Sequence, residues 1–121
     1  MHILLTIAIL LILAHTAGAQ SPSVRKQQYT AAVFTRGAGW DTAKAPSAQP
    51  HFAEHGKNLQ RLRASGAVAL GARYGDYGMV VFKSGNIDSV RALFSTDSLV
   101  LKDILHMELY PFLPFYPGTI E

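Results

Sequence analysis

The stretch AVALGARYGDYGMVVFK, residues 67–83, decides the fold. Two runs rich in strand-forming residues, 67–74 and 79–83, flank the tetrad GDYG at 75–78, whose residue types favour a tight turn. This pattern predicts an antiparallel β-hairpin in the middle of the chain. The segments on either side of the hairpin then determine which of its two faces the helices cover.

A helix is predicted immediately before the hairpin, over residues 50–64. Pro50 suits the first turn of a helix, and Phe52, Leu59 and Leu62 follow it at helical spacing. Such spacing places the three apolar side chains on one face. That face is expected to pack on the sheet.

A second helix is predicted immediately after the hairpin. Asn86 has the side chain of a helix N-cap, and the helix is expected to end near residue 95. Its apolar residues share one stripe at helical spacing: Ile87, Val90, Leu93 and Phe94. A further short turn is expected at 99–102.

Two more strands, at 29–35 and 104–110, are predicted outside the helices, with a loop at 36–48 after the first. The element order is therefore βαββαβ. This order is typical of the ferredoxin-like α+β arrangement, in which two helices cover one face of a four-stranded antiparallel sheet.

The alternation of residues in the first and last strands of the chain indicates what covers the second face of the sheet. In the last strand, one set of side chains is Leu105, Met107 and Leu109, and the opposite set is His106, Glu108 and Tyr110. Both sets in the first strand are largely apolar, and two helices cannot cover two faces. We therefore expect a homodimer whose sheets enclose a shared interior, although the side chains can also tolerate partial exposure.

The N-terminus carries the pattern of an export signal. Residues 3–14 form an apolar run that only Thr6 interrupts, and Ala17-Gly18-Ala19 supplies the small residues of a cleavage site. We expect a signal peptide at 1–19, a flexible lead-in at 20–28, one domain at 29–121, and a secreted or periplasmic location. The apolar run is shorter than the roughly 20 residues of a membrane span, so we expect no stable membrane insertion after the leader is removed.

Composition excludes several classes of function. The chain of 121 residues carries a net charge of +3 from scattered lysines, arginines and acids, with no basic stripe, and so nucleic acid is not an expected partner. It contains no cysteine, which excludes disulfides, thiolate metal sites and cysteine nucleophiles.

The spacing His55-x3-Leu59-x2-Leu62-x3-Gly66, followed by the hairpin, a helix, Asp97 and then Glu108-x2-Pro111-Phe112, resembles the YciI-like (YCII-related domain) family. The resemblance covers roughly residues 29–112. It implies a dimeric α+β barrel and an active-site pair, at His55 and Asp97 in this chain. A glycine is common in the family where this chain has Asp103, and Pro-aromatic commonly follows the aspartate where this chain has Ser98-Leu99.

A histidine paired with a carboxylate is suited to acid-base chemistry. The imidazole titrates near neutrality, and a carboxylate on its other nitrogen fixes the tautomer and stabilises the charged ring. The resemblance extends to a superfamily that includes lactone isomerases and small monooxygenases. It implies cofactor-independent lyase or isomerase chemistry on a small cyclic or carbonyl-bearing ligand, with His55 as acid and base and Asp97 orienting it.

Two alternatives to a catalytic pair follow from the same residues. Asp97 lies in Thr96-Asp97-Ser98, just before a possible helical turn, and is suited to be an N-cap. If Asp97 and His55 both have structural roles only, the protein would be a non-catalytic module that binds a small ligand or serves assembly.

A zinc motif overlaps His55. Residues 51–55, His-Phe-Ala-Glu-His, match the pattern H-x-x-E-H, in which two histidines bind zinc. A third ligand would have to come from His106 or Glu108. So short a pattern recurs by chance, and we expect neither a metal nor a cofactor.

Other residues are candidates for binding a small-molecule substrate. Arg36 and Arg73, at predicted strand ends, have the charge to hold an anion, and His106 and Glu108 would face the dimer interior. Two loop aromatics, Trp40 and Tyr77, are expected either to line the mouth of a pocket or to cap the core.

Overall fold

The computed structural model describes residues 18, 26–116 and 118–120. The predicted leader, except for Gly18, and positions 20–25 of the lead-in lie outside the described residues. Within the described part of the chain, no helix combines the length and hydropathy that a membrane crossing requires.

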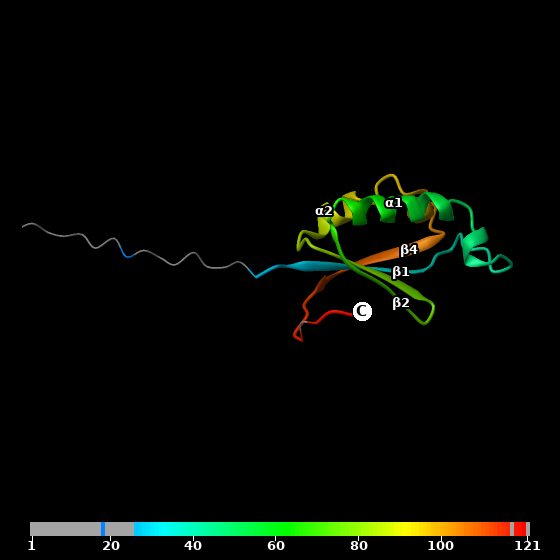
Figure 1. Ribbon diagram of the computed structural model, residues 1–121. Helices are drawn as coiled ribbons and strands as arrows, with labels where there is room; N and C mark the ends of the chain where they lie inside the picture. Colours follow the sequence, from blue (N-terminus) through cyan, green and yellow to red (C-terminus); the bar gives the residue numbers. More distant parts are fainter. Residues whose placement is uncertain (1–17, 19–25, 117, 121) are drawn as a thin grey trace, which may run out of the picture.

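The predicted α+β class and βαββαβ-like element order are confirmed (Figure 1). Four strands form one sheet: β1 (Tyr29–Arg36), β2 (Val68–Tyr74), β3 (Tyr77–Phe82) and β4 (Leu105–Phe112). Their order across the sheet is β2-β3-β1-β4, and every neighbouring pair is antiparallel. The first and third strands therefore form the centre, and the second and fourth form the edges.

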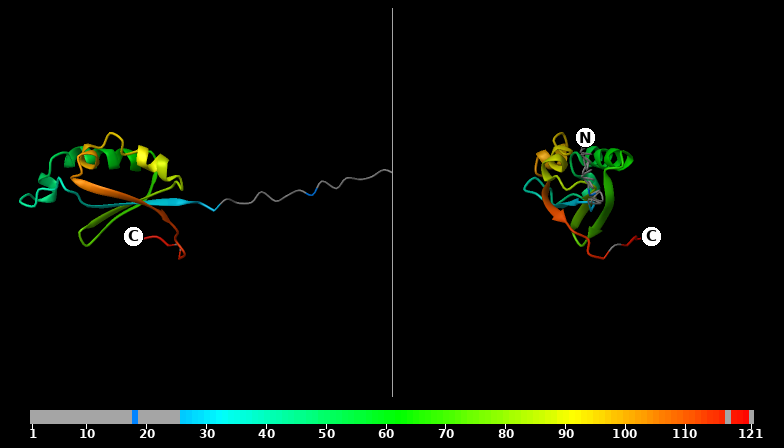
Figure 2. Two further views of the ribbon diagram at one scale, coloured as in Figure 1. Left: turned by 180° about the vertical axis from the view of Figure 1, so that it is seen from behind. Right: turned by 90° about the vertical axis from the view of Figure 1, so that its left-hand side faces the viewer.

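Helices lie on one side of this sheet. The longest is α1 (Phe52–Ala64), and α2 (Ile87–Ala92) lies beside it above the same face, as the views from behind and from the end show (Figure 2). Two shorter helices, η1 (Pro46–Ala48) and α3 (Ser98–Leu101), occupy the connections. The opposite side of the sheet carries no helix among the described residues.

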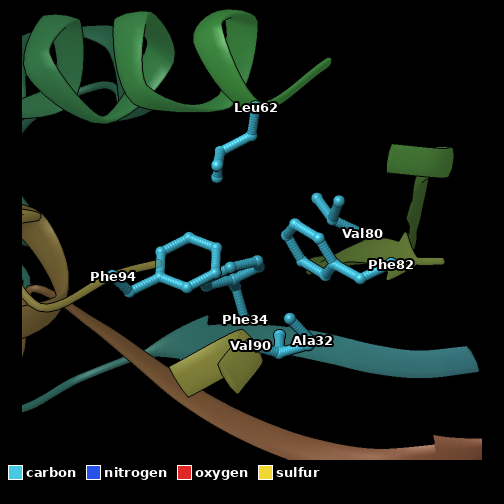
Figure 3. Close-up of a cluster of buried hydrophobic side chains, with 7 residues drawn as sticks. All are labelled: Ala32, Phe34, Leu62, Val80, Phe82, Val90 and Phe94. Carbon is cyan, nitrogen blue, oxygen red and sulfur yellow. The ribbon is translucent and has the colours of Figure 1, made fainter. Parts of the chain in front are cut away.

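The core lies between the helices and the sheet (Figure 3). Alternate residues of the central strands point into it, and the helix residues close it from above, as strand and helix periodicity require. Phenylalanine rings meet edge-to-face, with Phe94 centred 5.5 Å from Phe34 and 5.8 Å from Phe82. The buried members of this cluster are Ala32, Phe34, Leu62, Val80, Phe82, Val90 and Phe94.

The helix boundaries differ from those predicted. The first helix begins at Phe52 instead of Pro50, because His51 adopts a left-handed backbone conformation with φ of 63° and interrupts the helical path. The second ends at Ala92 instead of near residue 95. Beyond Ala92 the backbone hydrogen bonds join residues three positions apart, as in a 3-10 turn; the Phe94 N–H, for example, donates to the Arg91 carbonyl.

The strand boundaries also differ. The hairpin turn contains only Gly75 and Asp76, since Tyr77 and Gly78 already belong to β3, and Gly75 has the positive φ of 53° that such a turn requires. The last strand continues through Pro111 to the residue after it. Proline, which lacks an N–H, is tolerated there because β4 is an edge strand.

The second side of the sheet, which we call the open sheet face, is largely apolar. The predicted alternation in β4 is confirmed, since Leu105, Met107 and Leu109 pack against the core and the intervening residues do not. Tyr74 and Tyr77 stack on this face at 5.3 Å. By register, the face comprises Tyr29, Ala31, Val33, Thr35, Leu70, Ala72, Tyr74, Tyr77, Met79, Val81, His106, Glu108, Tyr110 and Phe112.

Candidate active site

His55 lies in the first half of α1 and points into the protein. Only 8% of its side chain is exposed. The imidazole packs beside two phenylalanine rings of the core, 5.3 Å from Phe34 and 6.5 Å from Phe94 between centroids. Its Nδ1 is 2.7 Å from Oδ2 of Asp97, which makes the expected contact between residues 42 positions apart.

Asp97 uses its two carboxylate oxygens for different purposes. Oδ1 accepts a hydrogen bond from the Leu99 N–H at 3.2 Å and caps α3, while Oδ2 contacts His55. The N-cap and the partner of histidine were alternatives in the sequence, and the structure contains both. The cap fixes the carboxylate, because Asp97 cannot rotate away from His55 without breaking the bond that starts α3.

The carboxylate of Asp97 is fully buried, which by itself disfavours its charged form. This burial tends to raise the pKa of Asp97, but the hydrogen bond and charge of His55, together with the bonds from Asn58 and the backbone, lower it further than burial raises it. The net result is a pKa below the usual aspartate range. The carboxylate is therefore ionised at neutral pH and can only accept hydrogen bonds.

Because an ionised carboxylate only accepts, the contact requires a hydrogen on Nδ1 of His55. In the neutral ring, Nε2 then carries the lone pair. No described residue forms a hydrogen bond with Nε2, and Nε2 is not among the fully buried polar atoms. It is the ring nitrogen available to an incoming molecule.

Asn58 is a member of the site that the sequence analysis missed. Its Nδ2 donates to Oδ2 of Asp97 at 3.1 Å, and its Oδ1 accepts from Arg61 at 2.6 Å. Asn58 follows His55 by three residues on α1, so both side chains lie on one face of the helix. That spacing was the available signal: a polar residue one turn from a buried histidine can reach the same partner.

A cavity of about 530 Å³ opens beside His55, between α1, the β2-β3 hairpin and the loop after β1. We call it the His55 cleft. This volume is within the range of small-molecule sites. The cleft is lined by Phe34, Arg36, Trp40, Pro46, Phe52, His55, Gly56, Leu59, Gly71, Ala72, Arg73, Gly75, Asp76, Gly78, Met79, Val80 and Leu105.

Both arginines that the sequence analysis selected line the His55 cleft. Arg36 ends β1 two residues after Phe34, on the side that faces the helices, and its guanidinium lies 5.2 Å from the centre of the Trp40 ring. Arg73 lines the cleft from β2. Trp40 lines the cleft, which is one of the two positions expected for it. Tyr77 belongs to the open sheet face.

The loop that carries Trp40 is held by close backbone packing. The N–H groups of Gly37 and Gly39 donate to the carbonyls of Ile104 and Asp103, and that of Ala38 donates to the Asp103 carboxylate. A Cβ on Gly37 would lie 1.9 Å from the Asp103 carbonyl oxygen, so only glycine fits. Further along the loop, the buried Gln49 side chain bonds both the N–H and the carbonyl of Asp41.

The structure does not bring the other two candidates to the His55 cleft. His106 and Glu108 lie on the open sheet face, across the sheet from His55, in an exposed cluster with Tyr110. Hydrogen bonds from Tyr110 and His106 lower the pKa of Glu108, and the same Glu108 contact raises the pKa of Tyr110. Within one chain, this cluster and the His55 cleft are separate.

The histidines of the H-x-x-E-H pattern have separate partners. His51 is the N-cap of α1 and lies 3.3 Å from Glu54, whereas His55 binds Asp97. Among the described residues, no group of three or more side chains of the metal-binding types is assembled.

Comparison with protein-family models, with curated proteins and with solved structures yields no match to this chain. A function for the protein is therefore inferred from the geometry of the site.

Proposed function

We propose that the His55 cleft is a cofactor-independent acid-base site that acts on a small cyclic or carbonyl-bearing metabolite, of lyase or isomerase type. The observation that carries the proposal is the 2.7 Å contact between Nδ1 of His55, which lines a cleft of small-molecule size, and the buried Asp97 that caps α3. His55 is the general acid and base, and Asp97 orients it.

The proton would move through Nε2 of His55. This nitrogen takes a proton from a carbon next to a carbonyl, and the imidazolium that forms is stabilised by the Asp97 carboxylate. The proton then returns to a different atom of the same molecule, which completes an isomerisation, or to a departing group, which completes an elimination. Asn58 holds the same carboxylate oxygen and acts through Asp97 as a positioning residue.

The proposal includes a ferredoxin-like fold, a dimeric α+β barrel and membership of the YciI-like family. The strand order β2-β3-β1-β4 with two helices on one face supports the fold. Asp103, which stands where a glycine is common in that family, has the left-handed φ of 52° that glycine adopts readily.

The proposed export to the periplasm or the medium predicts a mature N-terminus at Gln20.

Deuterium exchange tests the acid-base chemistry even while the natural substrate is unidentified. In a panel of small carbonyl compounds and lactones in D₂O, the protein is expected to accelerate C–H exchange of at least one member, measured by NMR. His55→Gln should reduce the rate by about 10²–10⁴-fold, the usual contribution of general acid-base catalysis.

His51→Gln is the matched control, because it removes the same chemical group one turn away without touching Asp97. It should leave the exchange rate unchanged. Exchange that persists in His55→Gln, or a panel with no accelerated member, would contradict the catalytic proposal.

The second candidate is a non-catalytic module of the same fold that binds a small ligand or serves assembly. The observation that favours it is the apolar open sheet face, with Tyr74, Tyr77 and Tyr110 each about half exposed. A stable ligand complex or dimer without any exchange that depends on His55 would support this candidate over the first.

A further inference from the structure

Among the charged side chains that line the His55 cleft, the positive ones outnumber the negative ones. Arg36 and Arg73 supply two guanidinium groups, and Asp76 supplies the one carboxylate. These three side chains therefore give the lining a net charge of +1. An anion is the ligand charge that such a lining attracts.

Arg36 is held in place without a strong partner. Its guanidinium lies 5.2 Å from the centre of the Trp40 ring, which restricts its position. Its ion pair with Asp76 is long, at 3.9 Å, and the two side chains are 54% and 84% exposed. Exposed pairs of this kind contribute little, so a ligand carboxylate can replace Asp76 at low cost.

Arg36 and His55 are within reach of one small molecule. Phe34 touches the imidazole, and Arg36 is two residues further along the same strand and on the same side. Two residues advance a strand by about 6.6 Å. A small molecule that binds Arg36 through a carboxylate can therefore reach His55 in the same cleft.

The walls between these charged groups are apolar. Trp40, Phe52 and Leu59 line the cleft together with the core residue Phe34. Aromatic and aliphatic side chains of this kind pack against a flat, apolar body. They provide no charge that would favour a second ionised group on the ligand.

We infer that the His55 cleft takes a small organic monocarboxylate, with its carboxylate on Arg36, supported by Arg73, and its apolar body between Trp40 and Phe52. The inference rests on the proposed function, because it specifies the substrate class of the same site. It also explains why a cleft with so apolar a lining contains two arginines: they fix the orientation of the ligand relative to His55.

The test compares phenylacetate with phenylacetamide, which has the same shape without the charge. Binding to the protein is measured by calorimetry and by NMR shifts of the Trp40 indole. Phenylacetate is expected to bind at least about 10-fold more tightly than the amide, as for a charge-assisted contact, and Arg36→Gln should abolish this preference.

Two further variants make the result specific. Asp76→Asn removes the competing carboxylate and should tighten phenylacetate binding, whereas Arg63→Gln, an exposed change on α1 outside the cleft, should have no effect. Equal binding of acid and amide, binding of neither, or an unchanged preference in Arg36→Gln would each overturn the inference.

The outcome is separable from that of the proposed function. If the cleft prefers the acid and no C–H exchange depends on His55, the inference holds and the catalytic proposal fails. If exchange depends on His55 but acid and amide bind equally, the reverse is true.

Discussion

Asp97 has one role in the fold and a second in the proposed chemistry. Its Oδ1 begins α3, and its Oδ2 receives His55 from α1 and is supported there by Asn58. The same residue therefore connects two helices and orients the imidazole. A carboxylate fixed in this way needs no rearrangement when the ring becomes charged, which is the property that acid-base catalysis requires.

The lowered pKa of Asp97 predicts how stability depends on pH. Because the pKa is lower in the folded than in the unfolded chain, the charged contact stabilises the fold above the unfolded value of about 3.8 and is lost as the pH falls through the folded value. Asp97→Asn keeps a capping oxygen but removes the charge. It should lower the free energy of unfolding by about 1–3 kcal/mol at neutral pH.

Urea denaturation across a pH series measures this effect. The difference between the wild type and Asp97→Asn should persist down to a pH of about 3.8 and shrink below it. Asp88→Asn, an exposed change in the first turn of α2, is the control and should show a much smaller difference. A deficit for Asp97→Asn that does not vary with pH would mean that its charge contributes nothing.

At the scale of elements, the loop after β1 gives the cleft its aromatic wall. It is positioned by the contact of Gly37 with Asp103, where an added Cβ would lie 1.9 Å from a backbone oxygen. Gly37→Ala should therefore destabilise the protein by about 1–3 kcal/mol, in the range of overpacked sites, and should move Trp40. Thermal unfolding and indole fluorescence measure the two effects.

Gly56→Ala provides a control with the opposite sign. A Cβ at Gly56 meets no atom within 4 Å, and the residue lies inside α1. Alanine there should raise stability by about 0.5–1 kcal/mol, because it reduces the freedom of the unfolded chain. Equal effects of the two substitutions would contradict the account of the loop.

The elements could be predicted from sequence because their signals are local. Strand alternation placed Leu105, Met107 and Leu109 on the core side, and the capping residue Asn86 was identified correctly, since its side chain accepts from the Ser89 N–H. The left-handed conformation of His51 was not predictable, because it depends on how the loop meets α1.

The candidate site was predictable only in part. The spacing identified His55 and Asp97. The position of Asn58 one turn after His55 was a signal that it could reach the same partner, but the tertiary fold shows that its partner is the Asp97 carboxylate. His106 and Glu108 were assigned to the correct face of β4, yet the cleft lies on the other side of the sheet. Which side holds a cavity depends on side-chain packing between distant segments.

At the scale of the whole molecule, the two sides of the sheet differ. One side carries the helices and the His55 cleft, and the other is the open sheet face, with the C-terminal segment on that side (Figure 1). That segment exposes four large apolar residues: Leu113, Phe115, Tyr116 and Ile120. Burial of this surface against a second copy would remove it from water, which supports the proposed homodimer.

The proposed dimer predicts a specific response to charge on the open sheet face. Val33, half-buried on the central strand β1, pairs across the sheet with Met79 and Glu108. Val33→Asp should convert a dimer into a monomer at micromolar concentration, measured by light scattering, because an unpaired charge cannot be buried in the interface. Gln60→Asp, on the exposed surface of α1, should leave the dimer intact.

A wild-type protein that is a folded monomer at micromolar concentration would contradict the dimer. The result would leave the His55 cleft unaffected, because all the residues that form it come from one chain.

The tautomer of His55 tests the acid-base account most directly. Long-range ¹H–¹⁵N correlation spectra in alkaline buffer distinguish the two nitrogens of a neutral imidazole, and His55→Gln identifies the signal. We predict the hydrogen on Nδ1, toward Asp97, and a bare Nε2 that faces the cleft. A hydrogen on Nε2 would mean that Asp97 does not orient the ring, and it would contradict the proposed site.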